Sequence, residues 1–209
     1  MNTAAPVLPA LLGLLDLLGI AVFALTGALL AARLGQTFVT MAFFALVTGV
    51  GGGSVRDLLI GAPVFWIHDP LVAPVCLGVA LMAWLTPRVW WENEFLEWAD
   101  AAGLAAYAVL GTAKALAYGV PMVPAMLMGV ITGCAGGIIR DVLAGRPSIL
   151  MRPEIYVTAA ALSSTLTAGS AWLGLPNALG WPLAMAAGFG LRGAAMRMKL
   201  ALPAYRGTA

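Results

Sequence analysis

Seven long apolar stretches follow one another along the chain, and only short polar connections separate them. A membrane-spanning helix needs about 20 apolar residues, because the hydrocarbon core of a bilayer is about 30 Å thick. Backbone groups in lipid must form hydrogen bonds within their own segment, which favours helices. The pattern predicts an all-α integral membrane protein with one membrane domain (1–209). Its seven transmembrane helices are expected at about 7–32, 38–60, 71–85, 98–116, 122–144, 155–173 and 179–198.

The composition excludes several classes of function. Of the 209 residues, 62% are hydrophobic and only 10% are charged, whereas about a quarter are charged in a soluble domain. The net charge of +2 is too small and too scattered for a nucleic-acid surface, so no nucleic-acid partner is expected. The sequence has no phosphate-binding loop, H-E-x-x-H or G-x-S-x-G motif. We therefore expect a protein that is not an enzyme and holds no cofactor and no fixed metal ion.

The distribution of Lys and Arg predicts the orientation in the membrane. If the N-terminus lies outside, nine of the eleven basic residues fall on the cytoplasmic side, and only Arg56 and Lys114 fall outside. Seven helices then place the C-terminus in the cytoplasm. Three basic residues at the end of the last stretch are expected to meet anionic lipid head groups: Arg192, Arg197 and Lys199.

The sequence contains an internal repeat with an offset of 84 residues. The segment 48–63, T-G-V-G-G-G-S-V-R-D-L-L-I-G-A-P, aligns with 132–147, T-G-C-A-G-G-I-I-R-D-V-L-A-G-R-P, and nine of sixteen positions are identical. Each copy holds three helices, so an odd number of crossings inverts the second copy relative to the first. We expect two inverted three-helix repeats, at about 11–88 and 95–173, followed by a seventh helix at about 178–199.

Glycines are concentrated in the second and fifth helices. Each glycine inside a helix costs about 1 kcal/mol relative to alanine, so a kink or local unwinding is expected there, with freed carbonyls lining an ion pathway. Close helix packing alone is the alternative, since the glycines also follow a small-xxx-small spacing. The candidate residues of the pathway and kinks are Gly49, Gly51, Gly52, Gly53, Gly133, Gly136 and Gly137.

Charged residues within the apolar stretches are candidates for pore mouths or gates. They are Asp16, Arg56, Asp57, Asp100, Lys114, Arg140 and Asp141. An unpaired charge in the bilayer costs about 2.5–3.5 kcal/mol on insertion scales, so we expect ion pairs Asp16–Arg56 and Asp100–Arg140. Sequence neighbours on a helix do not face each other, so no pair is expected between Arg56 and Asp57. The same holds for the neighbouring pair at 140 and 141.

Two alternatives stay open for these charges. The ion pairs either form gates at the two ends of a pathway or only fix the register of the helices. Lys114 either extends to the membrane surface or enters the pathway, and the matching position in the first repeat is Leu30.

The doubled motif resembles that of a known family. The segments 49–57, G-V-G-G-G-S-V-R-D, and 133–141, G-C-A-G-G-I-I-R-D, lie one in each half of a seven-helix chain. The pair is similar to that of the prokaryotic trimeric intracellular cation (TRIC) channels, formerly grouped as membrane proteins with a duplicated "glycine transporter" domain. The resemblance implies a homotrimer in the prokaryotic inner membrane. It also implies one pore per protomer, between the two repeats. This pore conducts potassium ions, which bind only transiently.

Three functions are therefore compared. A passive potassium channel is the function that the resemblance implies. A secondary transporter of a small solute such as glycine is the alternative, and inverted repeats alone favour it. A structural protein that conducts nothing is the third. A channel gives unitary currents, whereas a transporter gives saturable exchange.

Overall fold

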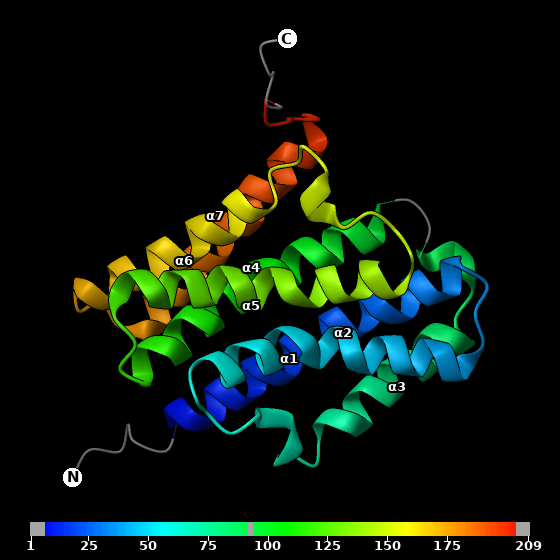
Figure 1. Cartoon of the computed structure of the whole chain (residues 1–209), viewed down its shortest axis with the longest axis horizontal. Coiled ribbons are helices and arrows are strands. Elements are labelled where there is room, and N and C mark those ends of the chain that lie inside the picture. The colour runs from blue at the N-terminus through cyan, green and yellow to red at the C-terminus, as the bar shows by residue number, and fades with distance from the viewer. Residues whose placement is uncertain (1–6, 92–93, 204–209) are drawn as a thin grey trace.

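The computed structural model describes residues 7–91 and 94–203, and this part of the chain contains seven α-helices (Figure 1). Three short 3₁₀ segments lie in the connections, at Phe65–Ile67, Arg88–Trp91 and Ile149–Met151. The α-helices are α1 (Val7–Arg33), α2 (Phe38–Leu59), α3 (Val72–Leu85), α4 (Phe95–Ala117), α5 (Met122–Leu143), α6 (Val157–Trp172) and α7 (Asn177–Arg197). The prediction of seven helices is confirmed, and each observed end lies within a few residues of the predicted one.

Glycine ends five of these helices by a common mechanism. The second residue after the helix adopts a left-handed backbone with φ between 64° and 78°, which an L side chain rarely accepts. These residues are Gly35, Gly61, Gly119, Gly145 and Gly174. Gly35 and Gly119, like Gly61 and Gly145, are separated by 84 residues. The repeat in the sequence thus recurs in the positions where helices stop.

Three helical stretches in the described part of the chain are long and apolar enough to cross a membrane. They are Asp16–Arg33, Phe38–Leu59 and Met122–Leu143. Helix α3 is also apolar but has only 14 residues. Helix α4 has 23 residues, but it carries Glu97, Asp100 and Lys114, which lower its hydropathy. A charged residue in such a helix requires a partner inside the protein.

The helices form two groups that pack against each other. Helices α1, α2 and α3 contact one another in the lower half of Figure 1, and α4, α5 and α6 contact one another in the upper half. Contacts of α1 with α4 and of α2 with α5 join the halves, while α7 packs on α4 and α6. The core between the halves includes Phe23 and Tyr107, whose rings meet edge to face with centroids 5.2 Å apart.

Contacts between the two halves occur in matched pairs. Gly19 of α1 lies against the ring of Tyr107 in α4, and Gly103 of α4 lies against the ring of Phe23 in α1. Adding 84 to the residue numbers of the first half gives those of the second. A side chain larger than hydrogen at either glycine would have to displace an aromatic ring. These glycines therefore allow α1 and α4 to approach closely.

Candidate functional site

Helices α2 and α5 meet at their glycines in the middle of the molecule. A Cβ atom added to Gly136 would lie 2.8 Å from the carbonyl oxygen of Thr48, and one added to Gly52 would overlap the carbonyl oxygen of Thr132. Real Cβ atoms do not approach an oxygen so closely. Only glycine therefore permits this contact between the backbones.

The other glycines of the two clusters also face neighbouring atoms. A Cβ atom added to Gly49 would lie 3.1 Å from Ile20 O, and one added to Gly133 would lie 2.8 Å from Leu104 O. A Cβ atom added to Gly51 would lie 2.8 Å from Ile139 Cδ1. Gly53 lies against the ring of Phe65, and Gly137 lies against the hydroxyl of Tyr156.

Both helices remain α-helical through the glycines. Of the two expected outcomes, kink or local unwinding, the unwinding is absent from the described helices, because contacts between helices compensate for the low helix propensity of glycine. Whether the helices bend there, and whether ions pass beside them, stays a prediction.

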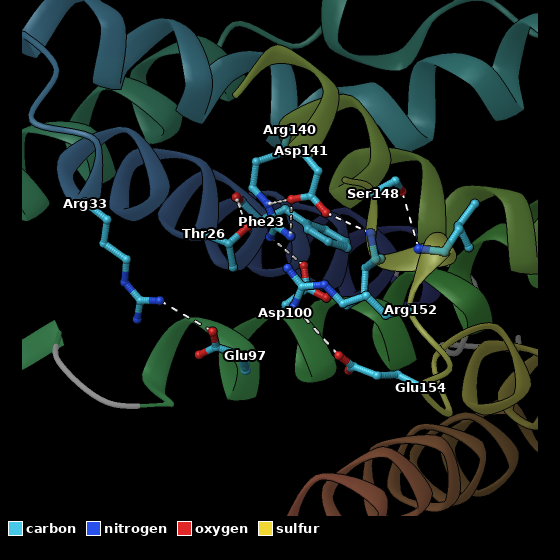
Figure 2. Close-up of polar contacts among 12 residues, drawn as sticks. Phe23, Thr26, Arg33, Glu97, Asp100, Arg140, Asp141, Ser148, Arg152 and Glu154 are labelled. Carbon is cyan, nitrogen blue, oxygen red and sulfur yellow. Dashed lines mark hydrogen bonds and ion pairs between the residues drawn. The ribbon is translucent and has the colours of Figure 1, made fainter. Parts of the chain in front are cut away.

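One charged cluster lies where α4 begins and α5 ends, and we call it the Arg140 end. Figure 2 shows Arg140 between two carboxylates: its Nη1 donates to Asp100 Oδ1 at 2.6 Å, and its Nη2 lies 3.0 Å from Asp141 Oδ1. The other oxygen of Asp141 accepts from the backbone N–H of Ile149 at 3.1 Å. Arg140 and Asp100 are buried, so this ion pair is shielded from water. The predicted pair Asp100–Arg140 is confirmed.

More charged side chains surround the Arg140 end. Arg33 donates to Glu97 at 3.4 Å, and Arg152 lies 3.7 Å from Glu154 (Figure 2). A small cavity of about 50 Å³ lies between these groups. Its charged lining residues are Arg33, Glu97, Asp100, Arg140, Asp141, Arg146, Arg152 and Arg192.

A second charged cluster lies where α2 and α4 end, and we call it the Arg56 end. Asp57 is fully buried and accepts from Arg56 Nε at 2.8 Å and from Lys114 Nζ at 2.8 Å. Its second oxygen accepts from the backbone N–H of Phe65 at 3.0 Å. The Lys114–Asp57 pair joins the two halves of the molecule. Lys114 therefore has a buried partner, so it does not simply extend to the surface.

Asp16 also lies at the Arg56 end, but the predicted pair Asp16–Arg56 is wrong. Within the described residues, Asp16 forms no ion pair, although it borders one cavity of about 350 Å³ together with Arg56 and Lys114. Arg56 Nε contacts Asp57, as Arg140 Nε contacts Asp141, but the terminal nitrogens of Arg56 reach no acceptor among the described residues, so the Asp16 carboxylate lies beyond ion-pair distance.

The expectation for sequence neighbours is also wrong, because both adjacent Arg–Asp pairs form: Arg56–Asp57 at 2.8 Å and Arg140–Asp141 at 3.0 Å. The side chain of arginine is long enough to fold back, so the direction of its Cα–Cβ bond does not decide which partner it reaches.

Arg192 is not a lipid anchor as expected. Its side chain is only 4% exposed, and Nη2 donates to Glu154 at 2.5 Å, while its guanidinium lies over the ring of Tyr156. Position at the end of an apolar stretch suggested the membrane surface, but α7 turns this side chain inward. Arg197 and Lys199 are exposed, so their contact with lipid head groups stays a prediction.

Three further residues were not identified from the sequence. Thr48 and Thr132 place their carbonyls at the crossing of α2 and α5. The hydroxyl of Tyr107 donates to the carbonyl of Gly49 at 3.4 Å, close to the same crossing. The signal was present, because the two threonines and the pair Phe23 and Tyr107 each follow the 84-residue offset.

Comparison with known proteins supports a common architecture. A family model described as "Glycine transporter" matches twice, at residues 13–88 and 97–172. The UPF0126 membrane protein of Vibrio cholerae is 38% identical over 201 residues, which cover 93% of this chain and 83% of the relative. The UPF0126 inner membrane protein YadS of Escherichia coli K12 is 37% identical, over 91% of this chain and 94% of the relative.

Solved structures agree with these relatives. The TRIC trimeric intracellular cation channel orthologue from Rhodobacter sphaeroides is 39% identical, with a TM-score of 0.84 over 91% of this chain and 99% of that one. A prokaryotic TRIC channel in 0.5 M KCl is 26% identical, with a TM-score of 0.83 over 91% of this chain and 98% of that one. The chain therefore belongs to the TRIC family of membrane proteins, whose domain the matching model describes as "Glycine transporter".

Proposed function

We propose that this protein is a passive cation channel that mainly conducts potassium ions. The observation that carries the proposal is the match to the Rhodobacter sphaeroides orthologue, which extends over nearly the whole of both chains at 39% identity. At this similarity the helix arrangement and most of the interior are shared. The secondary transporter remains the competing function that an experiment must distinguish.

The proposed pore lies within one protomer, between inverted repeats at about 11–88 and 95–173, with α7 outside the repeats. The matched contacts support this arrangement: Gly52 faces the carbonyl of Thr132, and Gly136 faces that of Thr48. Such reciprocity is what a pseudo-two-fold axis in the membrane plane produces. The family model supports it too, because it matches once in each half.

The proposed ion pathway runs from the Arg56 end to the Arg140 end past the glycines of α2 and α5. At the crossing, backbone carbonyls and threonine hydroxyls are the kind of oxygen ligands that a monovalent cation accepts in transit. Thr48 Oγ1 is buried and has no hydrogen-bond partner among the described residues. The ion pairs at the two ends are the proposed gates, since each holds helices of the pathway together.

Assembly and orientation are part of the same proposal. The orthologue from Rhodobacter sphaeroides is described as trimeric, and we expect a homotrimer with one pore in each protomer. The expected location is the inner membrane, with the N-terminus outside and the C-terminus in the cytoplasm. The charges support this orientation, because the cavity at the Arg140 end has five arginines in its lining and cytoplasmic sides are rich in basic residues.

Ion flux from liposomes tests the proposal. Purified protein reconstituted in liposomes loaded with KCl is expected to release potassium at a rate proportional to the gradient, without saturation. A glycine transporter would instead show saturable exchange of labelled glycine and no such flux. Gly52→Val is expected to abolish the flux, because its side chain would overlap the carbonyl of Thr132. Gly78→Val is the matched control, since an added Cβ there meets no described atom within 4 Å.

A further inference from the structure

The guanidinium of Arg56 is only partly used by the protein. The residue is 1% exposed, and its Nε donates to Asp57. Its two terminal nitrogens, Nη1 and Nη2, are buried and have no hydrogen-bond partner among the described residues. A buried charged donor without a partner is costly. The N–H groups of Nη1 and Nη2, on one side of the planar guanidinium, are therefore free to donate to an acceptor.

The matching arginine in the second half shows which acceptor suits this position. Arg140 makes the same contact with its neighbouring aspartate, and in addition its Nη1 donates to the carboxylate of Asp100 at 2.6 Å. Asp16 is the residue that matches Asp100, but it forms no ion pair with Arg56 within the described part of the chain. The second half thus supplies a carboxylate from its own chain, and the first half does not.

Arg56 borders a cavity large enough for a small molecule. The cavity measures about 350 Å³, and its polar lining residues are Asp16, Arg56, Lys114 and Asn177. Both oxygens of Asp57 are already occupied, by Arg56, Lys114 and the N–H of Phe65. Asp57 therefore does not compete for the terminal nitrogens of Arg56.

We propose that this cavity binds a small carboxylate on the two terminal nitrogens of Arg56. A planar guanidinium forms two parallel charge-assisted hydrogen bonds with a carboxylate, which makes this class of ligand the best fit. Two sources share this chemistry: a simple carboxylate such as acetate, and an amino acid such as glycine. An amino acid would also place its ammonium group near Asp16 on the same cavity wall. The proposal does not depend on ion conduction.

Thermal unfolding of the full chain in detergent tests the binding. Sodium acetate and glycine are each titrated in the presence of NaCl at constant ionic strength. A ligand that binds only the folded state raises the unfolding temperature in a saturable way. We expect a saturable rise with at least one of the two probes and none with methylammonium chloride. The absence of a saturable rise with either probe would overturn the proposal and would leave the channel proposal untouched.

Paired variants locate the site. Arg56→Lys keeps a charge beside Asp57 but cannot form two parallel bonds, so we expect the half-saturating concentration to rise at least tenfold. Arg140→Lys is the matched control, because its terminal nitrogens already contact Asp100 and Asp141, and it should bind the probe like the unmodified chain. Equal binding by Arg56→Lys and the unmodified chain would contradict the proposal.

Two more comparisons complete the test. If Arg56→Lys does not fold, Ala117→Trp replaces it as the test variant, because Ala117 is an exposed residue of the cavity lining and a tryptophan there would fill the cavity. Tyr118→Trp is its control, because Tyr118 is also exposed but does not line the cavity. Only the first variant is expected to lose binding, and loss in neither would reject the site. Asp16→Asn distinguishes the two sources. If the ligand is an amino acid, this variant should bind glycine more weakly and acetate more tightly. If the ligand is a simple carboxylate, it should bind acetate more tightly and leave the binding of glycine unchanged.

Discussion

Gly52 of α2 lies so close to the carbonyl oxygen of Thr132 in α5 that a single methyl group would overlap it. The matching contact, from Gly136 to the carbonyl of Thr48, is nearly as close. The two helices therefore meet backbone to backbone at this crossing. The contact requires glycine at this crossing, although glycine lowers the helix propensity of both segments.

Gly52→Ala is expected to destabilise the protein by about 1–3 kcal/mol, the usual cost of forcing an extra methyl group into a packed interior. Gly78→Ala in α3 should instead be stabilising by about 0.5–1 kcal/mol, because its Cβ meets no described atom within 4 Å and alanine favours the helix. Thermal unfolding in detergent measures both. Equal effects of the two substitutions would show that the crossing is not tightly packed.

Asp100→Asn should be far more damaging than Asp16→Asn. Asp100 forms the buried ion pair with Arg140, and removal of one partner of such a pair costs about 3–5 kcal/mol. Asp16 forms no ion pair in the described part of the chain, so its replacement should cost less than about 1 kcal/mol. Unfolding of the two variants under identical conditions checks this difference. A similar loss in both would indicate a direct Asp16–Arg56 pair in the membrane.

Lys114→Gln is expected to increase the potassium conductance. Lys114 borders the cavity at the Arg56 end, and since Arg56 already balances the charge of its partner Asp57, the positive charge of Lys114 repels cations that enter there. A positive charge about 8 Å away costs a cation about 2 kcal/mol at an effective dielectric constant of about 20, before screening by salt. The unitary current should therefore rise roughly two- to tenfold. Single-channel recording measures it, with the exposed Lys199→Gln as the control that should behave like the unmodified chain.

Arg192→Ala tests whether Arg192 is a buried partner of Glu154 rather than a lipid anchor. The buried guanidinium pairs with the partly exposed Glu154 and covers Tyr156, so its loss should destabilise the protein by about 1.5–3 kcal/mol. Lys199→Gln changes an exposed residue and should stay within about 0.5 kcal/mol of the unmodified chain. The two free energies of unfolding, measured in detergent without anionic lipid, are compared. A negligible effect of Arg192→Ala there would restore the lipid-anchor interpretation.

The helices and their order could be predicted because their signals are local. Each stretch is apolar, and turn glycines such as Gly35 and Gly119 mark where helices end. The pair Asp100–Arg140 could also be predicted, because the topology places both residues at one end of the bundle. These features depend on sequence position and on the direction of each helix, both of which the chain reveals directly.

The Arg56 end could not be predicted, because its pairing depends on side-chain reach. The same reasoning that was correct for Asp100 was wrong for Asp16, although the two positions match in sequence. Lys114 has no counterpart in the first half, where Leu30 stands, and it takes Asp57 as a partner across the two halves. Only the packing of α4 beside α2 brings these two residues together, and no local pattern encodes that contact.

The central claim is that the protein conducts cations passively, and a reversal potential tests it most directly. The purified protein is inserted into a planar bilayer with KCl at two different concentrations on the two sides. The account predicts step-like currents that reverse near the equilibrium potential of potassium, and their loss in Gly52→Val. Currents that reverse near the chloride potential, or intact trimers that carry no current while exchanging glycine in liposomes, would contradict it.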